Sequence, residues 1–449
     1  MKETKFKQTE VGMIPSDWEV CEIGSVCSIF GRIGFRGYTV LDLVDEGCGA
    51  ITLSPSNIKN NRMDYSKYTE ISWKKYEESP EIKIFNGDIL LVKTGSTFGK
   101  SALVENLPHE ATINPQFVVL KKIQISNAYL NYVIADTVVQ KQIQETIVGG
   151  AIPTLSQKQI AGFNIPLPSS TEQQRIANAL SDVDTLINNL EKLIAKKKNI
   201  KQGAMQQLLT GRKRLPGFGS DERQKECHSE RSATREVEES SGYKMTELGM
   251  IPSDWEVKTV SDVADNFIGL TYSPENVRDY GTLVLRSSNI QNDKIVYEDN
   301  VFVDMVIPER ALAHDGDILV CVRNGSKALI GKSAILDIGN AQMAFGAFMT
   351  VLRAKRGIDN RYLLYAWQSN MIQDQVQESL GATINQITNA DFKRFYLLTP
   401  SSIEEQTAIA NVLSDMDTEI SALETKLAKY RTLKTGMMQQ LLTGKIRLI

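Results

Sequence analysis

The chain has 449 residues, 42% hydrophobic and 23% charged, and a formal net charge of −3. This length allows two or three domains, and no apolar run approaches the roughly 20 residues that a membrane-spanning helix needs. A weakly acidic chain can bind nucleic acid only through local groups of basic residues. The polar start and five cysteines without a CxxC pair favour a cytoplasmic protein with no disulfide framework.

Residues 1–168 contain short strand-like runs that Gly, Pro, Asn and Ser interrupt. Three of these runs are GAITLSPSNI (49–58), GDILLVK (87–93) and QFVVLKKI (116–123). A helical pattern follows near residues 127–147. These features predict a small α+β domain.

Two stretches of this domain resemble catalytic motifs but are incomplete. TGSTFGKS (94–101) is similar to a phosphate-binding P-loop, yet one residue is missing between its glycines, so we expect a glycine-containing turn between two strands. NPQF (114–117) lacks the second proline of the N-P-P-[YF] signature of amino-methyltransferases, and no Gly-rich S-adenosylmethionine loop follows a strand. The three histidines lie far apart. We therefore predict no catalytic residue and no metal site in this chain.

Residues 169–212 are expected to form one long helix. Its apolar residues follow heptad spacing: Ile176, Leu180, Val183, Ile187, Leu190 and Ile194. Ser169 to Thr171 ahead of Glu172 predict an N-terminal cap, and Gly211 predicts the end. A helix of about 40 residues is ~60 Å long.

A polar, charged linker is predicted over residues 213–244. The segment Gly219–Gly242 is rich in Ser, Glu and Arg and shows no periodicity, so we expect an exposed tether. Cys227 and His228 in this segment have no second pair of metal ligands nearby.

The remainder of the chain repeats the first half in the same order. GMIPSDWEV occurs at 12–20 and 249–257, GDIL at 87–90 and 316–319, and MQQLLTG at 205–211 and 438–444. The second heptad series is Ile409, Leu413, Met416, Ile420, Leu423 and Leu427. Such a series of matches indicates a tandem duplication. We expect a second domain over 245–400 and a second helix over 401–449.

Two equal helices with matching apolar seams are most simply satisfied by packing on each other. The predicted fold class is α+β, with two tandem small α/β domains separated by two long antiparallel helices that form a coiled coil.

Polar and basic side chains recur at matching places in the two halves and are candidates for binding nucleic acid. Arg is the usual partner of guanine and Asn of adenine, whereas Lys, Ser and Thr suit phosphate oxygens. The candidates are Arg32, Arg36, Ser54, Ser56, Asn57, Lys93, Thr94, Ser96, Lys100, Arg286, Ser287, Ser288, Asn289, Arg323, Asn324, Ser326 and Lys332. We match Lys93, Ser96 and Lys100 with Arg323, Ser326 and Lys332.

Across all but the linker, the chain resembles the specificity subunit of a type I restriction-modification system. The resemblance rests on the combination of GMIPSDWEV, GDIL…GS…GK, NPQF, EQQRIA…LSDVDTLI and MQQLLTGRKRL. It implies two target recognition domains that each read one half of an asymmetric bipartite site in double-stranded DNA, with the two helices as a ruler. We match NPQF with NAQMAF (Asn340–Phe345) in the second half.

The resemblance also implies that catalysis belongs to partners. Two methyltransferase subunits would dock near the helices, and restriction-translocase subunits would join them. S-adenosylmethionine, ATP and Mg would then be bound by those subunits and not by this chain.

Two other functions stay open at this point. A standalone methyltransferase or nuclease would need the motifs that are incomplete here, and a coiled-coil scaffold would not retard duplex DNA. The two domains differ strongly whereas the two helices nearly match. This contrast is expected if the domains read different half-sites and the helices dock the same partner.

Overall fold

The computed structural model describes residues 5–32, 34, 37–147, 154–219, 242–339, 341–381 and 385–449. The chain divides into two compact units: unit 1 contains residues 1–191 and 425–449, and unit 2 contains residues 192–424. Unit 1 is thus assembled from two segments that are distant in sequence. Among the described residues, no helix is long and apolar enough to cross a membrane.

Unit 1 contains two β-sheets. In strand order, the first has β4 (Ser28–Gly31), β14 (Phe117–Lys121), β11 (Ile89–Val92), β12 (Ser101–Leu103), β8 (Arg62–Met63) and β7 (Ile58–Lys59). The second has β10 (Lys83–Ile84), β13 (Ala111–Ile113), β6 (Ala50–Leu53), β9 (Thr69–Ile71) and β5 (Leu43–Val44). Two further pairs are β1 (Phe6–Thr9) with β2 (Gly12–Pro15), and β3 (Glu19–Glu22) with β15 (Asn164–Leu167).

Strand β11 explains how these layers are held together. Its residues alternate in direction, as in any strand. Ile89 and Leu91 pack in a core with the helices, whereas Leu90 and Val92 pack against the second sheet. Both faces of the strand are buried, which is why its sequence is continuously apolar.

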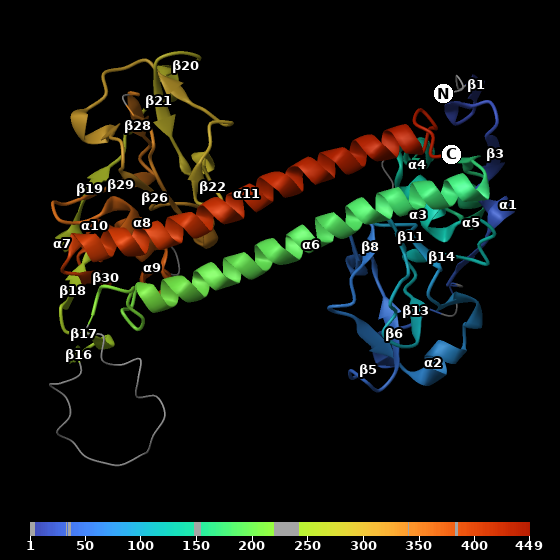
Figure 1. Ribbon diagram of the computed structural model, residues 1–449, viewed down its shortest axis with the longest axis horizontal. Coiled ribbons are helices and arrows are strands. Elements are labelled where there is room, and N and C mark those ends of the chain that lie inside the picture. The colour runs from blue at the N-terminus through green and yellow to red at the C-terminus, as the bar shows by residue number, and fades with distance from the viewer. Residues whose placement is uncertain are drawn as a thin grey trace, which may run out of the picture. The chain divides into compact units, whose positions relative to one another are not determined.

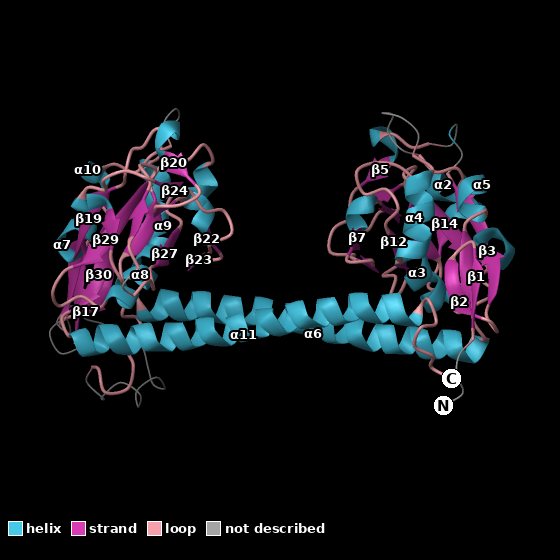
Figure 2. Cartoon of the chain, turned by 90° about the horizontal axis from the view of Figure 1, so that it is seen from above, coloured by secondary structure: helices cyan, strands magenta, loops and turns pink. Residues whose placement is uncertain are grey.

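Most helices of unit 1 cover the first sheet. They are α1 (Ile23–Val26), α3 (Asn127–Ala135), α4 (Thr137–Glu145), α5 (Gln157–Ala161) and parts of α6 (Ser170–Leu208) and α11 (Ile403–Leu441). Helix α2 (Trp73–Glu77) lies instead against the second sheet, where Tyr76 packs with Ala50 and Ile71. The helical pattern predicted near 127–147 is two helices, because Asp136 leaves the helical conformation and caps α4. Helix α3 packs on β12 (Figure 2).

Unit 2 repeats this arrangement. One sheet has β19 (Ala264–Ile268), β29 (Met349–Ala354), β26 (Ile318–Cys321) and β27 (Ser333–Ile335). The other has β20 (Val277–Arg278), β24 (Phe302–Val303), β21 (Thr282–Leu285), β28 (Met343–Phe345) and β25 (Leu312–Ala313). The further pairs are β16 (Tyr243–Thr246) with β17 (Gly249–Pro252), β18 (Trp255–Thr259) with β30 (Tyr396–Pro400), and β22 (Ile290–Gln291) with β23 (Lys294–Ile295).

The helices of unit 2 match those of unit 1 except α2, which has no counterpart among the described residues of unit 2. They are α7 (Val260–Val263), α8 (Asn360–Gln368), α9 (Asn370–Ser379), α10 (Asn389–Phe392) and parts of α6 and α11. In β26, Ile318 and Val320 pack toward the helices, whereas Leu319 and Cys321 pack toward the other sheet. The duplication seen in the sequence is therefore a duplication of the layers.

Helices α6 and α11 are each 39 residues long, and each has residues in both units. Ion pairs join them: Asp184 with Lys434 and Glu191 with Arg431 in unit 1, and Lys197 with Glu419, Lys198 with Glu424 and Lys201 with Asp417 in unit 2. Within each unit, residues further along α6 meet residues earlier in α11, so the helices are antiparallel there (Figure 1). The predicted fold class is confirmed.

The predicted seam agrees with the structure, and so does the predicted serine cap at the start of each long helix. The heptad residues of α6 are buried, and so are those of α11 except Met416 and Leu423, which are half-buried. Ser169 and Ser402 accept hydrogen bonds from the backbone of the first helical turn. Part of the predicted linker belongs to unit 2, because Leu215 packs against its core.

Candidate nucleic-acid interface

A buried glutamate joins three segments of unit 1. Glu172, at the start of α6, is 2% exposed and accepts a hydrogen bond of 3.0 Å from the indole of Trp18. Arg447 donates to both oxygens of Glu172, at 2.6 and 2.8 Å, and to both oxygens of Asp17, at 2.9 Å each. We call this network of Trp, Glu, Arg and Asp the clamp of unit 1. It fixes the domain to both helices.

Unit 2 has the same clamp, built from the corresponding residues. Glu405 is 1% exposed and accepts a hydrogen bond of 3.1 Å from Trp255. Arg214 donates to Glu405 at 2.6 and 2.8 Å and to Asp254 at 2.8 and 2.9 Å. The two carboxylates raise the pKa of the Arg214 guanidinium, chiefly through the hydrogen bonds to Glu405. Arg214 lies in the predicted linker, so the linker begins later than its composition suggested.

The motif GMIPSDWEV and the glycine of MQQLLTG meet at these clamps. Gly444 and Gly211 have φ values of 68° and 67°. A Cβ atom at Gly444 would lie 2.4 Å from Pro15, and one at Gly211 would lie 2.5 Å from Pro252. Only glycine combines this backbone conformation with so close an approach, so the repeated motif and the repeated glycine are parts of one joint.

A second polar network attaches each domain to both helices. In unit 1, Tyr132 donates to Asp184 at 2.9 Å, and Lys434 of α11 pairs with Asp184 at 2.8 Å. In unit 2, the corresponding distances are 2.8 Å from Tyr365 to Asp417 and 2.6 Å from Lys201 to Asp417. The pKa of each tyrosine hydroxyl is raised by burial and by its aspartate. We call these networks the Tyr-Asp-Lys triads.

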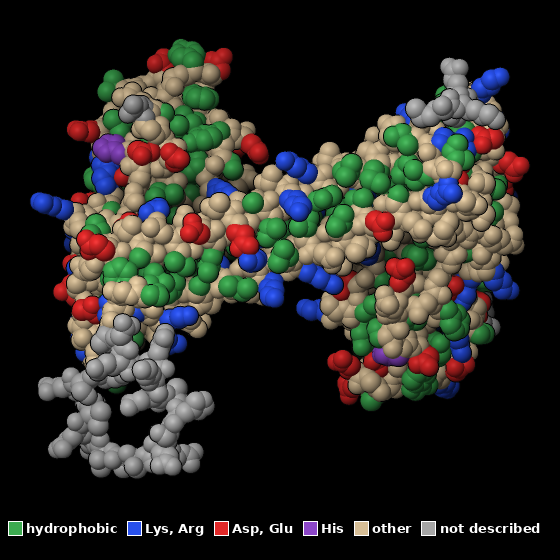
Figure 3. Space-filling view, viewed as in Figure 1, with side chains coloured by type: hydrophobic (Ala, Val, Ile, Leu, Met, Phe, Trp, Pro, Cys, Tyr) green, Lys and Arg blue, Asp and Glu red, His purple; other side chains and the backbone are tan. Residues whose placement is uncertain are grey.

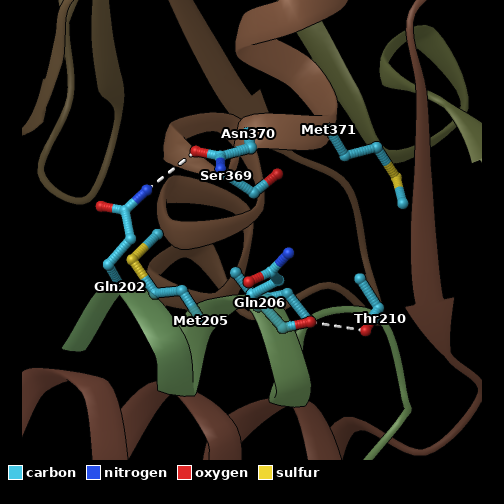
Figure 4. Close-up of a pocket in the computed structure, with 8 residues that line it drawn as sticks. Gln202, Met205, Gln206, Thr210, Ser369, Asn370 and Met371 are labelled. Atoms are coloured by element: carbon cyan, nitrogen blue, oxygen red, sulfur yellow. Dashed lines mark hydrogen bonds between the residues drawn. The ribbon is translucent and has the colours of Figure 1, made fainter. Parts of the chain in front are cut away.

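Unit 2 has an additional contact between α6 and α9. Gln202 donates a hydrogen bond of 2.8 Å to Asn370, and Met205 and Met371 line a small hollow beside it (Figure 4). This hollow lies on the helix side of the unit, where no candidate residue lies, so we do not include it in the interface.

The candidate residues gather where strands of each domain end. In unit 1 the strand-end surface comprises Ser54 and Ser56 after β6, Lys93 to Ser96 after β11, Asn114 to Gln116 before β14, and Thr154. Backbone hydrogen bonds hold these segments together: Asn114 N donates to Leu53 O at 2.9 Å, and Lys93 N donates to Gln116 O at 2.8 Å. Thr94 and Thr154 share a hydroxyl hydrogen bond of 3.0 Å.

The strand-end surface of unit 2 comprises Arg286 to Ser288, Arg323 to Ser326, Gly346 to Phe348, and Gln386. Gly346 N donates to Leu285 O at 2.9 Å, and Val322 N donates to Phe348 O at 3.0 Å. Asn324 bonds Ser287 at 3.3 Å. The same backbone frame therefore carries both surfaces.

These hydrogen bonds also show which positions correspond, and they change two of our matches. Arg323 and Thr94 form the equivalent isolated bridges, with Gln386 and Thr154, so Arg323 corresponds to Thr94 and not to Lys93. Lys93 instead corresponds to Val322. The backbone N–H of each donates to the corresponding turn of its own unit, at Gln116 O and Phe348 O.

The counterpart of NPQF also differs from our match. The strand pairings place Phe117 opposite Val92 and Met349 opposite Cys321, so NPQF corresponds to Gly346–Met349. Asn114 and Gln116 therefore correspond to Gly346 and Phe348. Asn340 lies outside the described residues. Counting forward from the repeated GKSA (99–102 and 331–334) gives this same register.

Three candidates are used inside the fold. Arg32 is 6% exposed and donates to Ile113 O at 3.0 and 3.1 Å. Asn57 and Asn289 are 2% and 0% exposed, and their amides fix the loops that follow them, with donors to Asp64 O at 2.9 Å and Val296 O at 3.0 Å. Their side chains cannot reach a ligand, and nothing in the local sequence signals their burial. Arg36 lies outside the described residues.

Other candidates face solvent or are half-buried at the surface. Ser56, Ser96, Lys100, Arg323 and Ser326 are exposed, and Lys332 is half-buried. Ser288 is instead a buried hydroxyl for which no partner is found in the described structure, and Arg286 pairs with Asp299 at 2.8 Å. Basic and acidic side chains are interspersed over the visible face (Figure 3), so any binding depends on individual residues and not on one large basic patch.

Lys93 is the most unusual cation of this set. Its side chain is half-buried, and burial lowers the pKa of its amine. Within the described residues, no carboxylate or carbonyl oxygen is paired with that amine. A desolvated amine without a counter-ion gains from an anionic ligand, so Lys93 is well placed for a phosphate.

The turn that resembles a P-loop has a structural role. In each unit it joins two antiparallel strands, β11 with β12 and β26 with β27. Gly99 and Gly331, with φ of 83° and 84°, lie against Gln140 of α4 and Gln373 of α9. This agrees with the predicted glycine-containing turn. Among the described residues, no three His, Cys, Asp or Glu side chains could hold a metal ion.

The model of the type I restriction modification DNA specificity domain matches residues 15–202 and 252–429. The chain belongs to this family. The two matched segments coincide with the two copies of the duplication. The chain is a specificity subunit, which supplies DNA sequence recognition and not catalysis, so neither the standalone enzyme nor the DNA-independent scaffold describes it.

Relatives and solved structures agree with this assignment. The chain is 25% identical over 460 residues to the type I restriction enzyme MjaVIII specificity subunit of Methanocaldococcus jannaschii, which covers 99% of this chain and 97% of the relative. It is 28% identical over 204 residues to the EcoKI specificity subunit of Escherichia coli K12, covering 44% of each.

The fold is shared with the S subunit of a type I restriction-modification system from M. genitalium. That crystal structure has a TM-score of 0.54 at 13% identity, covering 94% of this chain and 96% of the other. In the present chain, the clamps and triads lie where each domain joins the two long helices. Sequence reasoning missed them, although the repeated EQ pairs at Glu172 and Glu405 were a signal.

Proposed function

We propose that each strand-end surface binds one half of a bipartite target in double-stranded DNA. The observation that supports this is the comparison of the two surfaces. Aligned by their hydrogen bonds, they share one backbone frame, but the side chains at four corresponding positions differ completely: Lys93 and Val322, Thr94 and Arg323, Asn114 and Gly346, Gln116 and Phe348. The two surfaces thus have the same backbone arrangement but different side chains. This is what we expect of two domains that read different bases.

The partners follow from the family and are part of the proposal. Two methyltransferase subunits would dock near α6 and α11, and restriction-translocase subunits would join this complex. Those partner subunits would bind S-adenosylmethionine, ATP and Mg. This chain would direct the partner subunits to the target in the cytoplasm. One solved neighbour, with a TM-score of 0.53 at 16% identity, comes from work on complex assembly and conformational transition of the type I system.

The repeated residues of the helices have a structural reason that is independent of any partner. Glu172, Asp184 and their counterparts are matched because they hold the clamps and triads. Near-identity of the helices is therefore no measure of partner docking, and the docking proposal depends on the family alone.

The test uses the complex reconstituted with its partner subunits. One variant carries Ser56→Ala and Ser96→Ala in unit 1, and another carries Ser326→Ala and Lys332→Gln in unit 2. Binding is measured to the natural target and to duplexes in which one half-site is scrambled. Each variant should lose discrimination for one half-site only.

The matched controls lie at the far ends of the same strands. Lys122→Gln follows β14, and Arg356→Gln follows β29, both exposed and distant from the strand-end surfaces. These controls should bind as the unaltered complex does. If both surface variants discriminate normally between natural and scrambled half-sites, DNA is bound elsewhere.

A further inference from the structure

Arg323 and Phe348 form an exposed pair that the fold does not explain. The guanidinium carbon of Arg323 lies 5.2 Å from the centroid of the Phe348 ring, and that ring is 56% exposed. Within the described part of the chain, no carboxylate pairs with Arg323. An apolar ring left in water gains free energy when a ligand covers it, and the exposed guanidinium keeps its donors available for such a ligand.

The backbone holds this pair in place. Val322 N and Arg323 N both donate to Phe348 O, at 3.0 and 3.2 Å. The turn that carries the ring is closed by a hydrogen bond of 2.8 Å from Met349 N to Gly346 O. The backbone of Arg323 also forms an isolated antiparallel β-bridge with Gln386. The two side chains therefore start from a fixed turn at the centre of the strand-end surface.

We propose that Arg323, supported by Phe348, reads a guanine in the half-site of unit 2. This rests on the proposed function and adds the base that is read. Lysine and arginine can both bind a phosphate, and such a contact carries no sequence information. An aromatic ring instead restrains the planar guanidinium, which can then donate two hydrogen bonds to O6 and N7 of guanine.

Unit 1 provides the contrast within the same chain. At the corresponding positions it has Thr94 and Gln116, with no cation and no ring. The Gln116 amide is held by Asn114 at 3.1 Å. Unit 1 therefore cannot make the same contact, and this guanine belongs to one half-site only.

The test is methylome sequencing of a host that carries the complete system with Arg323→Lys, Arg323→Gln or Phe348→Leu. Arg323→Lys keeps the charge and loses the planar fork, so discrimination at a single guanine of one half-site should fall by roughly 5- to 150-fold. Phe348→Leu should relax the same position less. The other half-site and the gap should stay unchanged. Because both side chains are at the surface, thermal unfolding should not change.

Arg356→Lys is the control, an exposed arginine beyond the opposite end of β29. An unchanged motif in both Arg323 variants would overturn the inference. So would a uniform loss of binding with a smaller salt dependence, which identifies a phosphate contact, or a unit 2 half-site without guanine. If Ser326→Ala with Lys332→Gln still lowers half-site discrimination, the proposed function stands even when this inference fails.

Discussion

The two units are alike on the side that meets the helices and unlike on the side where their strands end. Trp18 donates to Glu172 and Trp255 donates to the equivalent Glu405, with distances that differ by only 0.1 Å. At the strand-end surface, Thr94 is replaced by Arg323. The comparison separates residues that place a domain from residues that choose its ligand, within one chain and on one fold.

Mutations can test this difference between the two sides of each unit. Changes to the frame should have the same effect in either unit, whereas changes to a strand-end surface should affect one half-site. The expected effects differ in size, and lengthening of the helices should have the largest.

Lengthening both helices should change the target itself. We expect four residues inserted after Glu191 in α6 and after Glu424 in α11 to add ~6 Å and ~40° of rotation to each helix. One base pair of DNA spans ~3.4 Å, so the gap between half-sites should grow by one or two base pairs while their bases stay the same. Methylome sequencing measures both.

The control for this experiment is a four-residue insertion within the predicted linker, Gly219–Gly242, which should leave the gap unchanged. Insertion into one helix alone should impair assembly, because a clamp fixes each end of the pair in its own unit. An old gap with full activity in the doubly lengthened chain would contradict the ruler.

Removing a clamp arginine should strongly destabilise the unit that contains it. Arg214→Ala leaves Glu405 buried and without its counter-ion, which costs about 3 kcal/mol, and Arg447→Ala should cost the same in unit 1. Urea unfolding measures the change. The neighbour Lys213 is exposed, and Lys213→Ala should change stability by less than about 0.5 kcal/mol. Unequal losses in the two units would show that the clamps are not equivalent.

The Tyr-Asp-Lys triads should matter less and again equally. Tyr365→Phe and Tyr132→Phe each remove one hydrogen bond to a charged acceptor, worth about 1.5 kcal/mol. Tyr297→Phe alters a half-exposed tyrosine outside the triads and is the matched control. Thermal unfolding tests this, and a loss confined to one unit would count against a common frame.

The smallest effect is expected from a single phosphate contact. Lys93→Gln should weaken binding to all duplexes alike and reduce the slope of log K against log salt by about 1. Lys122→Gln, at the other end of β14, should leave the slope unchanged. A loss that depends on the base sequence would instead assign base readout to Lys93.

The sequence alone predicted the seam of the long helices, but it did not predict which candidate residues are accessible at the strand-end surfaces. Heptad spacing located the seam from Ile176 to Ile194, because periodic burial leaves a periodic pattern. The strand-end candidates were found by repetition, yet Asn57 and Asn289 repeat because their amides fix a loop. A residue can be repeated in both halves because it is needed for folding or because it binds a ligand. Repetition alone therefore cannot distinguish a buried amide from one that contacts a ligand.

The register of the surfaces was already contained in the sequence. Counting forward from the repeated GDIL places Lys93 opposite Val322, and counting from the repeated GKSA places NPQF opposite Gly346–Met349. We matched residues of similar chemical type instead, and the hydrogen bonds from Val322 and Gly346 corrected those matches. The clamps were missed for a different reason. Their members come from segments up to 275 positions apart, and no local pattern joins those segments.

The span of the unit 1 clamp has a consequence for synthesis of the protein. Arg447 bonds Glu172 across 275 positions, whereas Arg214 bonds Glu405 across 191. At about 5–20 residues per second, a ribosome needs some tens of seconds between making Glu172 and making Arg447. Throughout that interval the nascent first domain has a glutamate without its arginine. Unit 2 has every residue of its own clamp once Glu405 is made, which is before Arg447 is made. The half of the protein that is translated first is therefore the last to be completed.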